Sequence, residues 1–463
     1  MALTGLHYAG ALLVFLLITV VGLYSGKKVK SADDFNYGGR RSGTGLVVGA
    51  IVGTIVGGSC TIGTSQLAFH YGLSAWWFTL GCCLGSLVLL FFFCESLYKN
   101  DYTTLAQIIA REYGEKAGIA ATILNSVGSF LSVVAQILSG IALITAVSHF
   151  NSFIAMFIVV ALIFVYVVFG GIWGAGYVGI AKTILLYTAI TVCGVLALYL
   201  QGGFRAFTAA LPPQRYFNLF ARGVAVDGGA GLSLILGILT TQVYLQVIMM
   251  SRTLRIAKNG ILISAIIIPL SSIGGILVGY YMKLNYPDII PAMALPLFIL
   301  EKMPPLFAGI ILATMLVTVV GTGAGMSLGI SAMISTDVYK VYINKEANDR
   351  QELFVNRFSI VLILIIAAAL ASVNTGSLIM GWSLLSMGLR GAGAFGPICA
   401  ALFLPGKIPP VYVLASMILA TALVLLGKFF LPPNVDPLFL GTAGNVLTLG
   451  IGLLVGRRKN RGK

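Results

Sequence analysis

Long apolar stretches follow one another along nearly the whole chain, separated by short polar connections. A bilayer core about 30 Å thick is crossed by about 20 apolar residues in helical form, so each stretch of that length predicts one spanning helix. The sequence holds about thirteen such stretches, at 4–25, 43–70, 72–97, 117–149, 150–169, 173–201, 228–251, 259–282, 304–336, 354–373, 377–403, 410–430 and 436–456. The pattern predicts an all-α, polytopic membrane protein that forms a single transmembrane domain over residues 1–463.

Composition and charge agree with a protein that lies in the lipid bilayer. Of the 463 residues, 58% are hydrophobic and only 9% are charged, whereas about a quarter of a soluble domain is charged. The net charge of +15 could indicate a nucleic-acid partner, but 21 of the 29 lysines and arginines fall in alternate loops and in the C-terminal tail. This is the positive-inside pattern. It predicts a multi-pass protein of the inner (plasma) membrane, with its N-terminus outside, its C-terminus in the cytoplasm and no nucleic-acid partner.

Two of the predicted helices are interrupted in a way that a simple spanning helix does not need. The stretch 43–70 contains seven glycines with serines and threonines beside them, and 228–251 contains the run Thr240-Thr241-Gln242. Irregular backbone at membrane depth is tolerated where it lines a cavity, and broken helices in corresponding halves of a chain indicate the central site of a transporter. The alternative is that the small residues serve only close packing between helices.

Three segments of the chain resemble the sodium:solute symporter family: 38–77, 240–260 and 309–340, the last of which ends in Thr336-Asp337-Val338-Tyr339-Lys340. The resemblance extends over nearly the whole chain. It implies a LeuT-type core of two inverted five-helix repeats, at 43–201 and 228–403. One extra helix at 4–25 precedes this core, and two peripheral helices at 410–456 follow it.

The resemblance also implies a function. Members of this family are secondary active transporters that import small polar organic solutes by alternating access, coupled to a sodium gradient. They need no cofactor beyond sodium as the coupling ion. A membrane solute sensor or a channel are the alternatives of another class. An enzyme is not expected, because the deep helices offer no histidine or carboxylate partner for a serine or cysteine nucleophile.

By the same resemblance, a cation site lies between core helix 1, at 43–70, and core helix 8, at 304–336. Its backbone carbonyls fall at Gly53, Val56 and Thr318, and its two hydroxyl positions at Gly321 and Thr322. Here the sequence departs from the family pattern, because Gly321 has no hydroxyl. The departure leaves a depleted site for a hard cation that prefers oxygen ligands.

A second departure is Lys182, which stands in the helix 173–201 where relatives often carry an aspartate. It lies roughly 13 Å along its helix, and an unpaired charge at that depth costs at least about 2.5 to 3.5 kcal/mol. Our hypothesis is that the Lys182 ammonium approaches the depleted site, replaces sodium, and makes transport sodium-independent or proton-coupled. The alternative is that Lys182 lines a water-filled inner vestibule.

Arg390 is the other deep basic residue, near the middle of 377–403, and we expect Asp337 and the other acids to lie in loops or at helix edges. Two deep cations without a deep carboxylate favour a solute that carries a carboxylate; alternatively, Arg390 only bonds helix-end carbonyls. The resemblance places the other solute contacts at the break of core helix 1 and on helices 3 and 6. These contacts are Gly57, Gly58, Ser59, Cys60, Gln136, Gln242 and Tyr244.

Overall fold

The computed structural model describes residues 3–27, 35–36, 38–100, 102–148, 150–432 and 435–461, and its regular structure there is helical. The helices of the first part of the chain are α1 (Gly5–Gly26), α3 (Thr44–Ile55), α4 (Ile62–Tyr71), α5 (Trp77–Val88), α6 (Cys94–Lys99), α7 (Leu105–Tyr113), α8 (Glu115–Val147), α9 (Ser152–Leu200), α10 (Phe204–Ala210) and α11 (Pro213–Tyr216). Those of the second part are α12 (Val224–Leu239), α13 (Gln242–Met250), α14 (Leu254–Ile267), α15 (Leu270–Asn285), α16 (Ala294–Lys302), α17 (Pro305–Met333), α18 (Asp349–Ser372), α19 (Ile379–Phe403), α20 (Pro410–Phe430) and α21 (Pro437–Arg461). Two short helical segments matter below, η2 (Gly72–Trp76) and η5 (Ile334–Ile343).

Ten helices in the described residues are long and apolar enough to cross a membrane, and an eleventh results if α12 and α13, which meet at a bend of 44°, form one span. The sequence predicted about thirteen. The difference lies in two stretches. The predicted helix 43–70 is broken, so that α3 alone is too short and α4 continues through η2 into α5, and the stretch 150–169 yields only the short helix Ser152–Val167 at the start of α9. Hydrophobic runs predict apolar segments well, but they do not show where a helix is interrupted.

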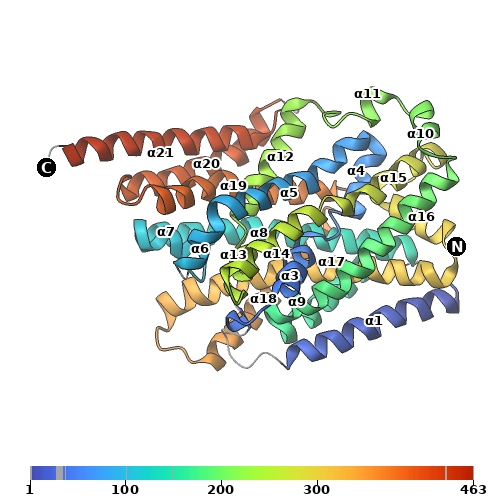
Figure 1. Cartoon of the computed structure of the whole chain (residues 1–463), viewed down its shortest axis with the longest axis horizontal. Helices are drawn as coiled ribbons and strands as arrows, with labels where there is room; N and C mark the ends of the chain where they lie inside the picture. Colours follow the sequence, from blue (N-terminus) through green and yellow to red (C-terminus); the bar gives the residue numbers. More distant parts are fainter. Residues whose placement is uncertain are drawn as a thin grey trace.

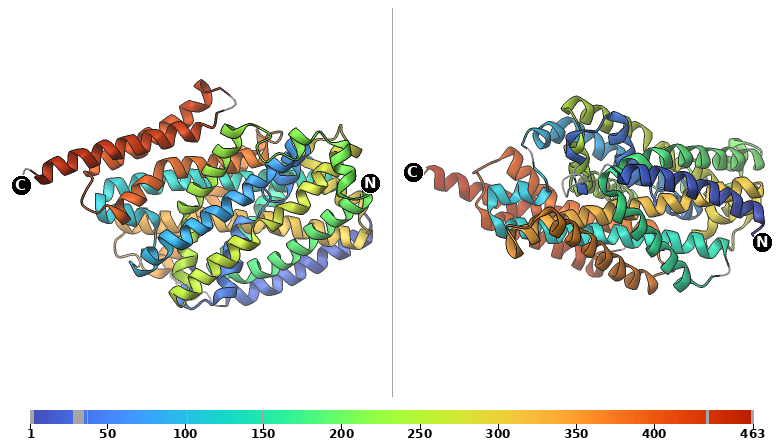
Figure 2. Two further views of the ribbon diagram at one scale, coloured as in Figure 1. Left: turned by 45° about the horizontal axis from the view of Figure 1, so that its top comes forward. Right: turned by 90° about the horizontal axis from the view of Figure 1, so that it is seen from below.

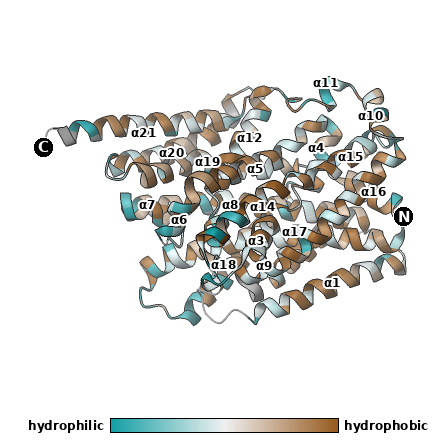
Figure 3. Ribbon diagram, viewed as in Figure 1, coloured by the Kyte–Doolittle hydropathy of each residue, from teal (hydrophilic) through white to brown (hydrophobic). Residues whose placement is uncertain are grey.

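The long helices lie side by side in one bundle, with α1 along one edge and the α20–α21 pair along another (Figures 1 and 2). The start of α1 and the end of α21 lie at opposite ends of the bundle. Hydropathy follows this geometry, because hydrophilic residues gather at the two ends and apolar residues fill the middle (Figure 3). This is the distribution of a multi-pass membrane protein whose long axis crosses the bilayer.

α1 shows how these helices pack. Its buried residues, His7, Gly10, Val14, Ile18 and Ser25, recur every three, four or seven positions and so form one face. That face lies against α17 and α9. Glycines at the crossing let the backbones touch, since a Cβ on Gly10 would overlap the carbonyl of Leu306, and a Cβ on Gly309 that of His7. The other faces of α1 are apolar and exposed, as expected for contact with lipid.

We therefore expect Gly309→Val to push α1 away from α17. The forced overlap with the backbone of His7 should lower the free energy of unfolding by about 1–3 kcal/mol, the usual cost of overpacking. Thermal melting of the purified protein in detergent measures this loss. Gly22→Val on α1 is the matched control, because a Cβ there meets no atom within 4 Å; equal melting temperatures for the two variants would contradict the packing described here.

Candidate functional site

The centre of the bundle contains a break in the first core helix, between the end of α3 at Ile55 and the start of α4 at Ile62. The backbone N–H of Gly57 donates to the carbonyl of Ile55 at 3.0 Å instead of to Gly53, four residues earlier. The Gly53 carbonyl is thereby left without its helical partner. The break thus supplies a free carbonyl oxygen deep in the membrane region.

Side chains of neighbouring helices pack so closely against this break that only glycine fits there. The N–H of Gly58 donates to Gln136 Oε1 at 2.8 Å. A Cβ on Gly57 would come within 2.6 Å of Gln136 Oε1 and Thr322 Oγ1, and one on Gly58 would overlap the side chain of Ser139. Gln136 of α8 therefore contacts the unwound segment directly.

Lys182 of α9 is 1% exposed, and its ammonium lies against the free carbonyl of Gly53, to which it donates a hydrogen bond. It also donates to the Thr318 carbonyl at 3.1 Å and to Thr322 Oγ1 at 3.3 Å. An ammonium has three N–H donors and no acceptor, so these three oxygens satisfy it completely. They belong to three of the positions that the family resemblance assigns to the cation.

The other two positions that the resemblance assigns to the cation, Val56 and Gly321, differ from these three. Val56 is fully buried at the first residue after α3. At Gly321, a Cβ would lie 3.1 Å from Lys182 Nζ and 3.3 Å from the Tyr166 hydroxyl. The missing hydroxyl at position 321 and the lysine at position 182 are therefore linked, because a larger residue at 321 would crowd the ammonium.

Ser59 and Cys60, the remaining break residues named from the sequence, contact partners within the protein. Ser59 Oγ lies 2.6 Å from Ser383 Oγ of α19, and the Cys60 thiol donates to the carbonyl of Ile55 at 3.3 Å. Both side chains are buried. The break is thus fastened on one side to α8 through Gln136 and on the other side to α19 through Ser383.

The second break separates α12 from α13 at Thr240 and Thr241. Gln242 is the first residue of α13, and both polar atoms of its amide bond to the segment that leads into α7. Its Oε1 accepts from the N–H of Leu105 at 3.0 Å, and its Nε2 donates to the carbonyl of Thr103 at 2.9 Å. The structure places Gln242 against the start of α7 and not opposite the first break. Tyr244, two residues further along α13, is buried.

Arg390 is fully buried and lies at this second break. Its guanidinium donates to Thr241 Oγ1 at 2.9 Å, to Ser129 Oγ at 3.4 Å and to Ser386 Oγ at 3.3 Å, and its Nε donates to the Ser386 carbonyl. None of the partners of Arg390 or Lys182 in the described residues is a carboxylate. The centre of the bundle therefore holds two positive charges that are solvated by hydroxyl, carbonyl and thioether groups.

Asp337 lies near the end of the span that begins with α17, where the protein buries its carboxylate. It lies in η5, is 9% exposed, and its carboxylate accepts from Thr104 Oγ1 at 2.7 Å and from Thr122 Oγ1 at 3.0 Å. It joins η5 to the start of α7 and to α8. Its partners are hydroxyls, and it forms no ion pair with Lys182 or Arg390.

Several polar residues of the centre were missed by sequence reasoning, above all Ser129, Ser132 and Ser139 of α8. Together with Gln136 they are spaced by three, four and three residues and are all buried, which places them on one face. On α19, Ser383, Ser386 and Arg390 follow the same spacing, and Ser132 Oγ lies 2.7 Å from Ser386 Oγ. A periodic row of serines in an apolar helix was the signal that could have found them.

Comparison with known structures identifies the class of protein. The chain matches a Na+-coupled sialic acid symporter in a substrate-bound outward-open state, with a TM-score of 0.82 and 17% identity over 98% of both chains. The fold is therefore LeuT-like, as predicted. The family to which the chain belongs makes it a membrane transporter and not an enzyme.

The family follows from the sequence match. Residues 35–406 match the sodium:solute symporter family, and the chain belongs to it. It is 24% identical to the high-affinity proline transporter PutP of Bacillus subtilis (strain 168), over 88% of this chain and 89% of that protein. It is also 24% identical to the high-affinity choline transporter 1 of Drosophila melanogaster, over 78% of this chain and 61% of that protein.

We expect Gly58→Ala to disturb the first break. The added methyl group overlaps Ser139, so the backbone must shift away from Gln136 and strand the Gly58 N–H, which costs about 1–3 kcal/mol when buried. Solute uptake into proteoliposomes should fall at least tenfold, with a lower melting temperature in detergent. Gly63→Ala in the same span is the control, because its Cβ would meet only ordinary contacts at 3.6 Å. Normal uptake by Gly58→Ala would show that the break is not part of the transport path.

Proposed function

We propose that this chain is a secondary active transporter that imports a small polar organic solute by alternating access, and that the Lys182 ammonium takes the place of the sodium ion. The proposal rests on one observation: the three donors of the ammonium point at Gly53, Thr318 and Thr322. A sodium ion on the same oxygens would occupy the place of Nζ. At an effective dielectric constant of about 20, two unit charges even about 4 Å apart repel by about 4 kcal/mol. The tethered cation and the free cation therefore exclude each other.

A tethered ammonium changes what can drive transport. A sodium ion enters from one side and leaves on the other, whereas Lys182 stays attached to α9. The site can be emptied of positive charge only if Lys182 releases a proton or swings away from α3 and α17. We therefore propose proton-linked, sodium-independent import, in place of the sodium coupling that the family resemblance implies.

We propose further that the helices form two inverted five-helix repeats, at 43–201 and 228–403. The breaks α3/α4 and α12/α13 support this arrangement, because each lies in the first spanning segment of its repeat. α1 then precedes the core, and α20 and α21 lie at its periphery, which completes thirteen helices. Alternating basic loops support a cytoplasmic location for the end of the bundle that carries the C-terminus.

For the solute, we propose a molecule that carries a carboxylate, held by Arg390. The guanidinium is buried at a helix break without an acidic partner in the described residues, and a bidentate carboxylate is the group that it binds best. Proline and sialic acid, the solutes named for two relatives, both carry a carboxylate. A cation such as choline would instead meet two fixed positive charges.

The cation proposal predicts a switch in ion dependence. The double substitution Lys182→Ala with Gly321→Ser removes the ammonium and restores a hydroxyl, so the site regains its oxygen ligands and loses its internal cation. Sodium should then raise the melting temperature, since a ligand at 100 times its Kd stabilises a protein by about 2.7 kcal/mol. The wild-type protein should melt equally in sodium, potassium and choline chloride. Its uptake should respond to an imposed proton gradient and not to a sodium gradient.

The single substitutions serve as controls for this experiment. Gly321→Ser alone crowds the ammonium and should reduce uptake without creating a response to sodium. Lys182→Ala alone leaves an incomplete ligand set and should respond to sodium more weakly than the double variant. Sodium-driven uptake by the wild-type protein would refute the exchange of cation for ammonium.

The solute proposal predicts selective loss of anion binding in Arg390→Gln. A thermal-shift screen of proline, sialic acid, choline and other small organic solutes identifies a solute that binds the wild-type protein. Its affinity should then fall at least tenfold in Arg390→Gln, because a charged hydrogen bond contributes about 1.5–3 kcal/mol. The carboxamide analogue of that solute is the matched control, and both proteins should bind it equally weakly. Unchanged affinity for the carboxylate would leave Arg390 with only a structural role.

A further inference from the structure

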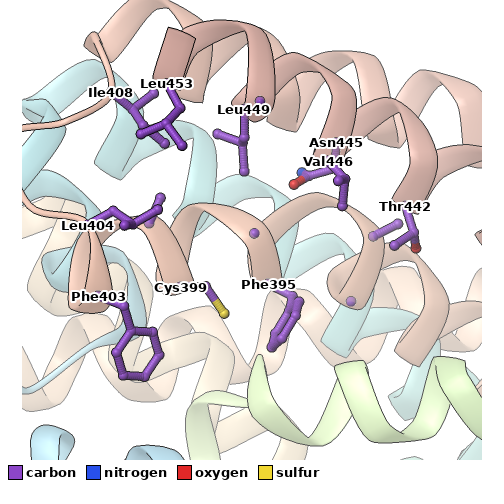
Figure 4. Close-up of a pocket in the computed structure, with 15 residues that line it drawn as sticks. Phe395, Cys399, Phe403, Leu404, Ile408, Thr442, Asn445, Val446, Leu449 and Leu453 are labelled. Carbon is purple, nitrogen blue, oxygen red and sulfur yellow. The ribbon is translucent and has the colours of Figure 1, made fainter. Parts of the chain in front are cut away.

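An apolar crevice runs between α19 and α21, outside the transport core (Figure 4). Its volume is about 320 Å³. Side chains from both helices line it, and the connection between α19 and α20 closes one end at Leu404 and Ile408. Representative lining residues are Phe395, Cys399 and Phe403 of α19 and Asn445, Leu449 and Leu453 of α21.

The length of the crevice corresponds to one leaflet of a bilayer. Its lining extends from Gly391 to Phe403 on α19 and from Thr442 to Leu453 on α21. At 1.5 Å per residue these stretches are roughly 16–18 Å long, and half of a hydrocarbon core is about 15 Å thick. A molecule that filled the crevice would therefore lie parallel to the lipid chains of one leaflet.

The crevice remains open although its walls contain residues that usually let helices meet. Small residues in spanning helices ordinarily permit close approach, and Gly396, Ala400 and Gly450 all line this space. α21 touches α19 where Asn445 Nδ2 donates to the Gly393 carbonyl at 3.2 Å and where a Cβ on Gly396 would overlap Asn445 and Leu449. Nearer the C-terminal end, a Cβ on Gly450 would meet no atom within 4 Å. The space between the two helices is therefore open toward this end.

Basic side chains surround the end of the crevice that lies nearest the C-terminus of α21. Lys407, Arg457 and Arg458 are exposed, and none of them forms a hydrogen bond or ion pair with a residue that the structure describes. The backbones of Gly456 and Lys407 touch, which brings these basic positions together. The carboxylate beside this group is Glu112, which accepts from the N–H of Gly406. The mouth of the crevice is therefore positively charged.

From these observations we infer that the crevice binds one acyl chain of an anionic phospholipid, whose phosphate is held by Lys407, Arg457 and Arg458. The apolar slot can hold an acyl chain, its length matches one leaflet of the bilayer, and its basic mouth can bind an anionic headgroup. Basic residues near an anionic membrane surface attract its headgroups. This inference does not depend on the proposed transport function.

The test is native mass spectrometry of the full-length protein, freed of lipid in detergent and then titrated with phosphatidylglycerol or with phosphatidylcholine of the same acyl chains. The wild-type protein should bind one phosphatidylglycerol at least tenfold more tightly than phosphatidylcholine. Gly450→Leu fills the slot without a clash and should abolish that preference by excluding the chain. The triple variant Lys407→Gln, Arg457→Gln, Arg458→Gln should bind the two lipids equally.

Two controls match these variants. Gly22→Leu places the same side chain on α1, also where a Cβ meets no atom within 4 Å, and Arg205→Gln removes an exposed charge at the opposite end of the bundle. Both should bind phosphatidylglycerol as the wild type does, and melting temperatures check that every variant is folded. Undiminished phosphatidylglycerol binding by Gly450→Leu, or equal wild-type binding of the two lipids, would overturn the inference. Dimers of the wild-type protein that Gly450→Leu dissociates would instead identify a second copy as the occupant.

Discussion

The central architecture depends on the ammonium group of Lys182, which joins α9 to α3 and α17 in the middle of the bundle. A positive charge at this depth is costly unless its donors are satisfied. The break after α3 supplies the Gly53 carbonyl, and α17 supplies the carbonyl of Thr318 and the hydroxyl of Thr322. The lysine and the helix break therefore stabilise each other: the break exposes an oxygen that needs a donor, and the lysine needs acceptors where a membrane offers few.

The sequence was sufficient for the fold but not for every contact within it. Apolar runs gave the positions of the spanning helices, and the glycines near Gly57 and Gly58 marked the first break. The partnership of Lys182 with Gly53 could be proposed because the family resemblance assigns Gly53 to a cation site that lacks a hydroxyl at Gly321. The bonds of Gln242 to Thr103 and Leu105 were not foreseen, since the direction of a side chain on a bent helix depends on the bend. Hydropathy placed Asp337 at the end of a span, but it could not show that Thr104 and Thr122 donate hydrogen bonds to its buried carboxylate.

Polar contacts fasten both ends of the bundle around this centre. At one end, Gln242 binds the segment before α7, and Asp337 binds Thr104 in the same segment. At the other end, Asp227 forms an ion pair with Arg222 and accepts from Ser74. α12 carries Asp227 near its outer end. The outer end of α13 is held by Ser42, whose N–H donates to the Met250 carbonyl at 2.9 Å, whereas Gln242 lies beside the hinge. An element hinged at Thr240 and Thr241 and held at both ends can release one end while the other stays fixed, which is the motion that alternating access requires.

α19 connects the polar centre of the bundle to its periphery, because one side of the helix faces the core and the other side lines the crevice. Ser383, Ser386 and Arg390 face the core, where they contact Ser59, Ser132 and Thr241. Phe395, Cys399 and Phe403 line the crevice beside α21. Gly391, next to Arg390 in the chain, touches α12 at Leu236 and also lines the crevice. A molecule that fills the crevice would therefore press on the same turn of helix that holds the buried guanidinium, so the lipid around α21 and the polar centre are separated by a single helix.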